Sequence, residues 1–515
     1  MFITPTIFLW LLVLTLVFVR CYKFLFDKPI NFPLGPPRFP LIGCYGILLM
    51  INWRHLHKAV AKLCQYYQTS ILGMYLGDFG TVYVNDFDAV KEVLYRVEFD
   101  GRPDLFLARM REKNFQRRGI FFTEGPDWKE QRRFILRHLR DYGFGRRFEE
   151  LEAETNAEIM TLIEMLKYGP RYEHEREFMK DGYVKCPAVF SACFANAFLH
   201  VFCGERIPRE GAGVLFETGK SALKFQRLGD DFGTILSLLP WLKNIFPNAT
   251  NYNGIREASL AVNAFIESIV QKHLASYDGN HIRSFLDLYF RDMQKTIPKE
   301  GDRFSFQYDQ LILGIVDFFF PAISGATTQI ALLMERLLLH PEVLNRMQAE
   351  IEDVVGNGRL PSLNDRINLP YTEATLREGM RIDTLVPSGI AHVATEDTTL
   401  RGYDIPKGTI LLLGLDAIHN QLDVWGDPFR FRPERFLDNR GKLSLAKDIS
   451  IPFGAGKRLC AGETFARNTM FLIVSALVQN FDLKQPPTDN LPDISKRNTG
   501  IIITPNDYWV KFVPR

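Results

Sequence analysis

Hydrophobic and polar positions separate most sharply at the start of the chain. Residues 2–19, FITPTIFLWLLVLTLVFV, carry no charge, and cations follow at Arg20, Lys23 and Lys28. A run of this length is just enough to cross a bilayer as a helix. It lacks the basic start and the A-x-A site of a cleaved signal peptide. The pattern predicts a single membrane anchor over residues 1–28, with the chain after it in the cytosol because cations follow the apolar run.

Prolines interrupt the pattern directly after this anchor. NFPLGPPRFPLIG, residues 31–43, contains four prolines, which exclude a regular helix and stiffen the backbone. We therefore expect a Pro-rich hinge over residues 29–43, followed by one soluble domain over residues 44–515. Within that domain, ILGMYLGDFGTVYVND predicts two short strands around Gly-Asp-Phe-Gly.

Helical periodicity dominates the middle of the chain. From about residue 125 to 350, apolar residues recur at helical spacing. Turn-rich and strand-like stretches return at 384–416, and the last hundred residues or so mix loops, a long helix after Cys460 and a β-like tail. The predicted fold class is mostly α with a small β-rich portion.

Composition narrows the classes of function. Lys and Arg total 62 against 60 for Asp and Glu, so no cationic excess favours nucleic acid as a partner. The 42 phenylalanines indicate a large aromatic interior, which an apolar pocket would also need. The seven cysteines include no CxxC pair, which argues against zinc and iron–sulfur sites, and their odd number and scatter argue against a disulfide framework.

One cysteine stands in an unusual setting. FGAGKRLCAG, residues 453–462, places Cys460 among three glycines and two cations. Glycine permits close approach of backbone to a bulky group. We expect Lys457 and Arg458 to lower the pKa of the thiol and favour the thiolate. Such a thiolate suits either a nucleophile or the axial ligand of a metal, and the loop alone leaves both open.

Two upstream motifs add paired charges. LREGMRI at 376–382 puts Glu378 and Arg381 three residues apart, on one helix face. FRPERF at 431–436 supplies Arg435 in a proline-bounded turn. Alone, the first pair would be read as an ordinary surface ion pair. A glutamate and two arginines upstream of a cysteine loop form a much narrower pattern.

The order ExxR, PERF, FxxGxRxCxG resembles that of the haem-thiolate proteins of the cytochrome P-450 family. FDGRP at 99–103, WKEQRRF at 128–134 and YDIPKGT at 403–409 extend the resemblance over nearly the whole chain. It is nearest to the microsomal branch that contains drug-metabolising and insect hormone-metabolising enzymes. The resemblance implies the helical fold of that family, with haem b buried between two helices.

The resemblance also implies roles for individual residues. Cys460 would be the fifth ligand of haem iron, with Gly456 and Gly462 letting its loop pass close to the porphyrin. Glu378, Arg381 and Arg435 would form a structural triad behind the haem. The remaining implied cofactor-binding residues are Trp128, Arg132, His392, Phe453 and Arg458, of which all but Phe453 would contact haem propionates. For His392, a plain surface position in a strand is the competing interpretation.

A basic stripe suggests a partner. Arg133, Arg137 and Arg140 recur at i, i+4 and i+7, and they form either a solvated face or a docking surface for an acidic electron donor. Microsomal members of the family use an NADPH-cytochrome reductase, some with cytochrome b5. The chain has no GxGxxG signature of its own. The implied location is the endoplasmic reticulum membrane, with the catalytic domain facing the cytosol.

The oxygen-activating helix departs from the family pattern. Counting back from His340-Pro341, Ser324 takes the place of the usual acid and Gly325 that of the alcohol. Serine offers no ionised carboxylate and glycine no side chain. Thr327 and Thr328 would need a shift in helix register, which a kink at Pro321 could allow. Ser324, Gly325 and Thr328 are therefore the candidate catalytic positions.

Three functions stay open at this point. The first is a monooxygenase that inserts one atom of O2 into a small apolar hormone, lipid or xenobiotic. The second is an isomerase or dehydratase that needs neither oxygen nor NADPH, and the third is a non-catalytic haem or lipid binder. The basic stripe favours the first. The expected pocket is lined by Phe318, Phe319, Phe320, Ala322, residues 385–390, Ile501 and Ile502.

Overall fold

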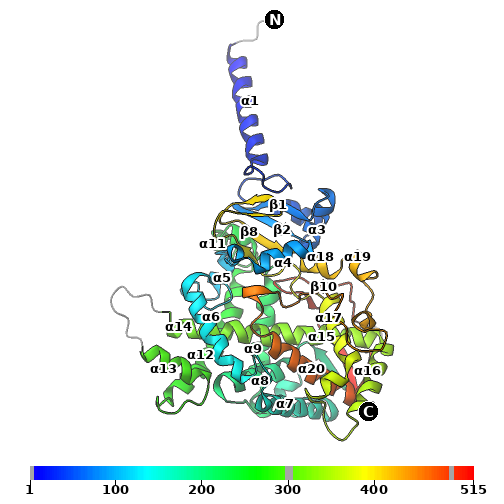
Figure 1. Ribbon diagram of the computed structural model, residues 1–515. Helices are drawn as coiled ribbons and strands as arrows, with labels where there is room; N and C mark the ends of the chain where they lie inside the picture. The colour runs from blue at the N-terminus through cyan, green and yellow to red at the C-terminus, as the bar shows by residue number, and fades with distance from the viewer. Residues whose placement is uncertain (1–4, 296–304, 487–491) are drawn as a thin grey trace.

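The computed structural model describes residues 5–295, 305–486 and 492–515, and helices make up most of it (Figure 1). The predicted fold class, mostly α with a small β-rich portion, is confirmed. The helices are α1 (Pro5–Phe26), α2 (Tyr45–Asn52), α3 (Leu56–Tyr66), α4 (Phe87–Tyr95), α5 (Phe106–Met110), α6 (Gly125–Leu139), α7 (Glu149–Tyr168), α8 (Ser191–Cys203), α9 (Gly213–Leu228), α10 (Ile235–Leu238), α11 (Leu242–Ile245), α12 (Tyr252–Ala275), α13 (Phe285–Lys295), α14 (Tyr308–Pro321), α15 (Thr327–Leu339), α16 (Pro341–Val354), α17 (Pro370–Ile382), α18 (Leu415–His419), α19 (Leu422–Trp425) and α20 (Glu463–Asn480).

Short strands gather into small sheets. They are β1 (Ile71–Leu76), β2 (Phe79–Val84), β3 (Met179–Lys180), β4 (Tyr183–Cys186), β5 (His392–Val393), β6 (Thr398–Leu400), β7 (Tyr403–Ile405), β8 (Ile410–Leu413), β9 (Phe481–Lys484), β10 (Arg497–Asn498), β11 (Thr504–Pro505) and β12 (Tyr508–Pro514). The two four-stranded sheets have the orders β1-β2-β8-β5 and β3-β4-β12-β9. The hairpin β1–β2 turns at Gly77 and Asp78, where the sequence predicts it, and pairs Ile71 with Val84.

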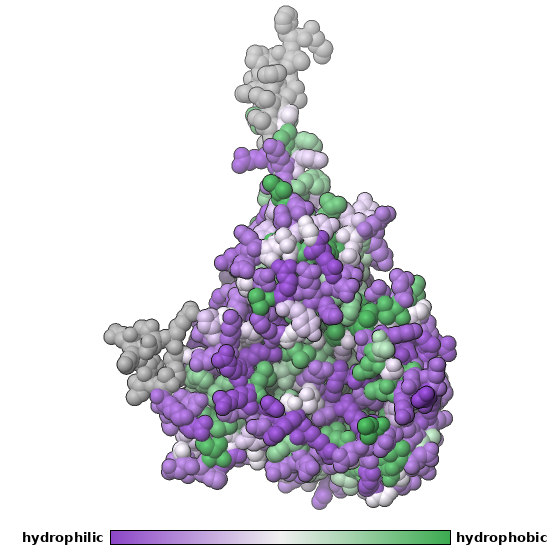
Figure 2. Space-filling view, viewed as in Figure 1, coloured by the Kyte–Doolittle hydropathy of each residue, from purple (hydrophilic) through white to green (hydrophobic). Residues whose placement is uncertain are grey.

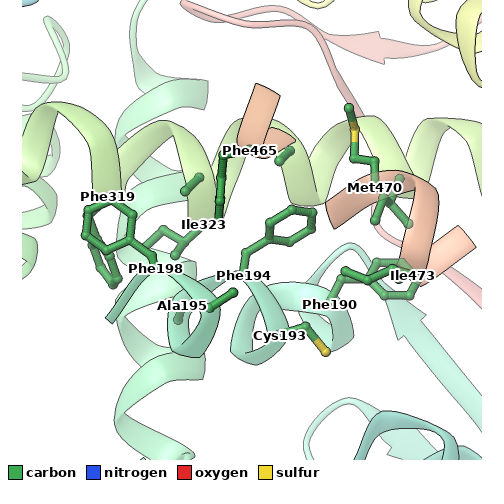
Figure 3. Close-up of a cluster of buried hydrophobic side chains, with 14 of the residues drawn as sticks. Phe190, Cys193, Phe194, Ala195, Phe198, Phe319, Ile323, Phe465, Met470 and Ile473 are labelled. Atoms are coloured by element: carbon green, nitrogen blue, oxygen red, sulfur yellow. The ribbon is translucent and has the colours of Figure 1, made fainter. Parts of the chain in front are cut away.

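A long apolar helix runs through the middle of the body. Tyr308–Leu339, formed by α14, a π-helical turn at Ala322–Ala326 and α15, is long and apolar enough to span a membrane, but 94% of its apolar window is buried inside the protein. It packs against α8, and α20 lies close to it further along. Phe198 of α8, Phe319 of α14 and Phe465 of α20 share one hydrophobic core (Figure 3). This helix is therefore the spine of the fold.

The N-terminal helix stands apart from the body. α1 is 22 residues long, and at 1.5 Å per residue it extends about 33 Å (Figure 1). Trp10, Leu14 and Phe18 are exposed on it. Its last turn meets the segment that follows, where the Arg38 N–H donates to the Leu25 carbonyl at 2.7 Å. A long helix with large apolar side chains exposed has the form expected of the predicted anchor.

The predicted hinge is tied to the body. The Lys28 ammonium donates to the Gly73 carbonyl at 2.9 Å, and burial lowers the Lys28 pKa to about 8. Arg38 pairs with Asp78 at 2.7 Å and stacks over the Tyr75 ring at 4.4 Å. Phe32 is buried in the core beneath β1. The segment is a docked brace between α1 and the sheet.

Candidate active site

The cysteine loop leads into the start of α20, the long helix predicted after Cys460. The Cys460 N–H donates to the Phe453 carbonyl at 3.0 Å, which closes the loop on itself. The Cys460 side chain is exposed, whereas Cys44, Cys64, Cys186, Cys193 and Cys203 are buried. Among the cysteines whose side chains the structure describes, Cys460 is therefore the one free to meet a ligand.

The electrostatics of the thiol differ from the sequence-based expectation. Desolvation by the surrounding protein raises the pKa of the Cys460 thiol, and the positive charges of Arg132 and Arg467 oppose that rise. Lys457 instead pairs with Asp100 at 3.5 Å, and Arg458 donates to backbone carbonyls. The prediction that Lys457 and Arg458 favour the thiolate was wrong, because both cations are engaged elsewhere. A thiolate here needs a further positive partner such as a metal.

Gly456 lies close to the backbone of a neighbouring helix. It has φ +66°, and a Cβ placed there would lie 1.9 Å from the Leu94 carbonyl at the end of α4. A Cβ on Gly462 would meet only Phe144, at 3.7 Å. Gly456 therefore lets the loop press against α4, whereas the space beside Gly462 is free of closer protein contacts.

Arginines converge beside the loop. Arg132 donates from α6 to the Leu459 carbonyl at 2.6 Å, and Arg458 donates to the Asp100 carbonyl at 2.6 and 2.9 Å. Arg102 is buried and donates to the Ala391 carbonyl at 3.0 Å. The sequence motif FDGRP contains Arg102, but the sequence analysis gave it no role.

The charge of these arginines is not balanced. Burial and then the neighbouring arginines lower the pKa of Arg102 well below its usual range. Burial and then Arg132 lower the Arg458 pKa to about 10. Burial also raises the pKa of the nearby Asp100 carboxyl, which weakens it as a counter-charge. Such a cluster fits a ligand that brings its own carboxylates.

Trp128 completes this cluster. Its ring lies under the Arg458 guanidinium, 3.5 Å from the ring centroid. Its Nε1–H is buried with no hydrogen-bond partner. Buried indole N–H groups normally have an acceptor. The unpaired donor beside Arg132 and Arg458 is what a bound carboxylate would satisfy, so these residues fit the propionates of a haem.

His392 lies in the same region on β5. Its Nδ1–H donates to the Phe99 carbonyl at 2.7 Å. Burial and then Arg102 lower its pKa well below the usual range. It is therefore a neutral imidazole, and its burial excludes the surface position considered as the alternative. Its Nε2 can interact with a carboxylate only after taking up a proton.

The triad forms as the sequence predicts. Arg381 pairs with Glu378 at 2.7 and 2.8 Å, and Arg435 reaches the same carboxylate at 3.0 Å. Arg381 is fully buried and also donates to the His419 carbonyl at 2.6 Å. These charges are paired and hydrogen-bonded, as buried charges must be.

His419 links this triad to the cysteine loop. The Ile451 N–H donates to Nε2 at 3.0 Å, so Nδ1 carries the proton and donates to the Thr384 hydroxyl at 2.8 Å. Thr384 in turn donates to the Arg381 carbonyl at 3.0 Å. The sequence analysis missed His419, because no local signal marks a histidine whose partners lie 32 and 35 residues away.

The spine helix is irregular at the candidate catalytic positions. The kink expected near Pro321 appears as the π-helical turn Ala322–Ala326, a feature common at functional sites. Ser324 donates its hydroxyl to the Phe320 carbonyl at 2.7 Å. The Thr327 and Thr328 hydroxyls are buried without a hydrogen-bond partner. Ser324 is thus engaged, and the two threonines hold the free hydroxyls.

The expected pocket residues divide between core and site. Phe318 packs on Phe144 and Phe202, and Phe319 packs on Phe198, so these two rings belong to the core rather than to a pocket (Figure 3). Phe320 instead packs on α9. Ala322 lies in the π-helical turn itself, and Leu385 is the nearest side chain to Gly325. Ile503 donates to the Leu385 carbonyl, and Ile501 donates to α9.

An exposed cysteine in a closed loop, an unbalanced cluster of buried cations and a broken apolar helix define a haem-thiolate protein. A profile of the family Cytochrome P-450 matches residues 33–512. The chain belongs to the cytochrome P-450 family. It is an oxidoreductase, a P-450 monooxygenase, and its cofactor is haem held through a cysteine thiolate.

Named relatives cover nearly the whole chain. Cytochrome P-450 2J3 of Rattus norvegicus is 31% identical over 95% of this chain and 92% of the relative. Cytochrome P-450 2E1 of Oryctolagus cuniculus is 31% identical over 100% of this chain and 99% of the relative. Farnesoate epoxidase of Bombyx mori is 28% identical over 94% of each chain. The chain is thus similar to microsomal members and to an insect enzyme.

Proposed function

We propose that this protein inserts one atom of O2 into a small, apolar, membrane-soluble hormone, lipid or xenobiotic, with electrons from NADPH. The observation that carries the proposal is the exposed Cys460 next to the unpaired Trp128 donor and the buried arginines. The Bombyx mori relative is named as an epoxidase, which is an oxygen-inserting activity. This similarity supports oxygen insertion over rearrangement.

The cofactor residues follow from the geometry. Cys460 would ligate the iron, and Trp128, Arg132 and Arg458, with the newly identified Arg102, would hold the propionates. His392 adds a neutral imidazole, and the Phe453 carbonyl fixes the Cys460 backbone. When bound, haem supplies the iron at which oxygen is activated, with electron density donated by the thiolate.

Proton delivery is assigned to Thr328. The Ser324 hydroxyl already donates its hydrogen bond to the Phe320 carbonyl, and Gly325 has no side chain. The Thr328 hydroxyl is fully buried and free to donate or accept. The same departure from the acid–alcohol pair is the observation that favours the second candidate, a rearranging isomerase or dehydratase.

The electron donor would bind the basic stripe. Arg133, Arg137 and Arg140 are exposed, and no ion pair to them is found among the described residues. Free cations on one face attract an acidic partner and speed its binding. Microsomal relatives use NADPH-cytochrome P-450 reductase. We propose the same reductase here, with cytochrome b5 as a further candidate.

Membrane attachment extends beyond α1. Leu41, Met50, Trp53, Trp241 and Phe246 are exposed, and together we call them the apolar surface. The N-terminal part of this surface and the part around α11 approach each other at the β1–β2 turn. A Cβ on Gly77 of that turn would lie 3.3 Å from the Leu41 carbonyl and 3.4 Å from Leu238, which closely precedes α11. α11 lies at the end of the body that carries α1 (Figure 1), and apolar residues lie among polar ones at the base of α1 (Figure 2).

This arrangement supports a domain order and a location. The anchor would span residues 1–28, the brace 29–43 and the catalytic domain 44–515. The cations after the apolar run favour a cytosolic body, and the similar microsomal enzymes favour the endoplasmic reticulum membrane. The apolar surface would then rest on the bilayer, where membrane-soluble substrates are concentrated.

Turnover under labelled oxygen gas tests the proposal. The purified holoprotein is incubated with a lipid extract, with and without NADPH and reductase, and products are identified by mass spectrometry. A product that needs NADPH and carries one labelled oxygen atom is expected. A product formed without NADPH and without label would instead establish the rearranging function. Haem-bound protein that forms no product from any lipid or xenobiotic pool would instead indicate a non-catalytic haem or lipid binder.

A further inference from the structure

Gln226 joins α9 to the irregular turn of the spine helix. Its side chain is 7% exposed, and its Nε2 donates to the Ser324 hydroxyl oxygen at 3.3 Å. The two residues are 98 positions apart in the sequence. A polar side chain buried to this extent is costly unless its hydrogen-bonding groups are satisfied.

Only one end of the Gln226 amide is satisfied. Ser324 has a single hydroxyl proton, which it donates to the Phe320 carbonyl, so it can only accept from Gln226. Gln226 must therefore turn its NH2 group toward Ser324. Its Oε1 is then left buried without a hydrogen-bond partner. The free end of the amide is an acceptor.

The backbone of Gln226 and the residue before it are held in place by neighbouring segments. The Ile501 N–H donates to the Gln226 backbone carbonyl at 2.8 Å, and a Cβ on Gly500 would lie 1.9 Å from that carbonyl. The C-terminal segment thus presses on α9 at this residue. The preceding ring, Phe225, packs on Phe320 at 4.9 Å between centroids. The free acceptor is fixed within largely apolar surroundings.

We propose that Gln226 determines substrate specificity, its Oε1 accepting a hydrogen bond from an alcohol, carboxylic acid or amide N–H on an otherwise apolar substrate. This inference rests on the proposed function, because it places the substrate beside the π-helical turn. A site built to hydrogen-bond one substrate group rejects the analogue without it, since the buried partner is left unpaired.

Matched haem ligands test this role. The probes are 1-alkylimidazoles with tails from ethyl to decyl, each with and without a terminal hydroxyl, and binding to the holoprotein is followed by its absorption spectrum. The imidazole binds the haem iron and so fixes one end of the probe. The length of the tail then determines how far from the iron the hydroxyl lies. At one tail length the hydroxyl is expected to tighten binding about tenfold, as one buried hydrogen bond would.

Variants assign that gain to Gln226. Gln226→Met, of similar length but apolar, should abolish the hydroxyl preference, and Gln226→Glu, which keeps an acceptor, should retain it. Gln348→Met is the matched control, because Gln348 is also a buried glutamine but lies on α16 and donates to the Phe481 carbonyl and the Asp482 carboxylate of β9. This control should bind as the wild type does.

Two results would overturn the inference. One is a wild-type protein in which no tail length gains from the hydroxyl. The other is a gain that persists in Gln226→Met. Each variant is first shown by its reduced carbon monoxide spectrum to hold haem through a thiolate. Because this assay measures binding, it can succeed even where turnover with labelled oxygen fails, so the two proposals are judged separately.

Discussion

At the residue scale, Gly456 is the least replaceable glycine of the cysteine loop. Gly454 and Gly456 both have positive φ, but only Gly456 lies against backbone. Gly454→Ala should cost about 1–2 kcal/mol from left-handed strain alone. Gly456→Ala should cost at least about twice that, since the Leu94 carbonyl must also move. Urea unfolding of both variants measures the difference, and equal losses would contradict the close packing on α4.

Cys460 carries the cofactor assignment. Cys460→Ala should abolish thiolate ligation and all turnover, because no other cysteine whose side chain the structure describes is exposed. The reduced carbon monoxide spectrum reports the ligand directly. A variant that keeps the parent's thiolate spectrum would refute the assignment. Cys203→Ala, at a buried cysteine on α8, is the control that should leave the spectrum unchanged.

At the scale of elements, the π-helical turn decides which hydroxyl can reach the site. Successive residues on α15 point about 100° apart, so Thr327 and Thr328 cannot face the same way. Thr328→Ala should lower product formed per NADPH about tenfold or more, since a positioned proton donor is lost. Thr327→Ala should leave that ratio unchanged. Equal ratios in the two variants would place proton delivery elsewhere.

Local patterns predicted several elements well. The hairpin at Gly77 and Asp78 and the end of α15 before His340-Pro341 follow from turn and proline chemistry within a few residues. The π-helical turn was visible only as a kink, because proline and glycine weaken a helix without deciding how its hydrogen bonds rearrange. Whether Phe318 and Phe319 face the core or a pocket depends on which helices pack on them. The pattern of a single helix does not contain that information.

The site was predictable where motifs mark it. Cys460, Trp128 and Arg132 fall in recognisable motifs, whereas Gln226 and His419 act through partners distant in sequence. The direction of the Cys460 pKa shift could not be predicted either, because it depends on how desolvation by the surrounding protein compares with the effect of cations that point elsewhere. Sequence spacing places residues near one another, but it does not show which partner each side chain takes.

At the scale of the whole molecule, His419 makes the fold sensitive to acid. Burial and then Arg381 lower its pKa to about 3, from 6.5 in an unfolded chain. Since the unfolded state binds the extra proton first, stability is complete above pH 6.5 and falls as the pH drops toward about 3. The full loss, reached as the pH falls to about 3, should be on the order of 5 kcal/mol.

His419→Gln isolates this contribution. Glutamine can still accept from Ile451 and donate to Thr384, but it does not titrate. The variant should show a smaller loss of unfolding free energy between pH 6.5 and about 4 than the wild type. Urea unfolding at a series of pH values measures it. An unchanged slope would mean that other groups dominate the response to acid.

Membrane attachment should survive removal of α1. A chain without residues 1–26 keeps the apolar surface, so it should fold and still float with vesicles. Further replacement of Met50, Trp241 and Phe246 by serine should release it, because each loses about 1.5–3 kcal/mol of apolar burial. Vesicle flotation measures both steps. Complete release by the deletion alone would show that the apolar surface does not bind lipid.

The docked brace has a consequence for enzyme kinetics. Because Lys28 and Arg38 fasten the base of α1 to the sheet, the body would be unable to turn freely above a bilayer spanned by α1. A substrate would then be drawn from the lipid phase, and the concentration that governs turnover is the one dissolved in that phase. Diluting the same substrate into more lipid should raise the apparent KM in proportion, although its total concentration is unchanged.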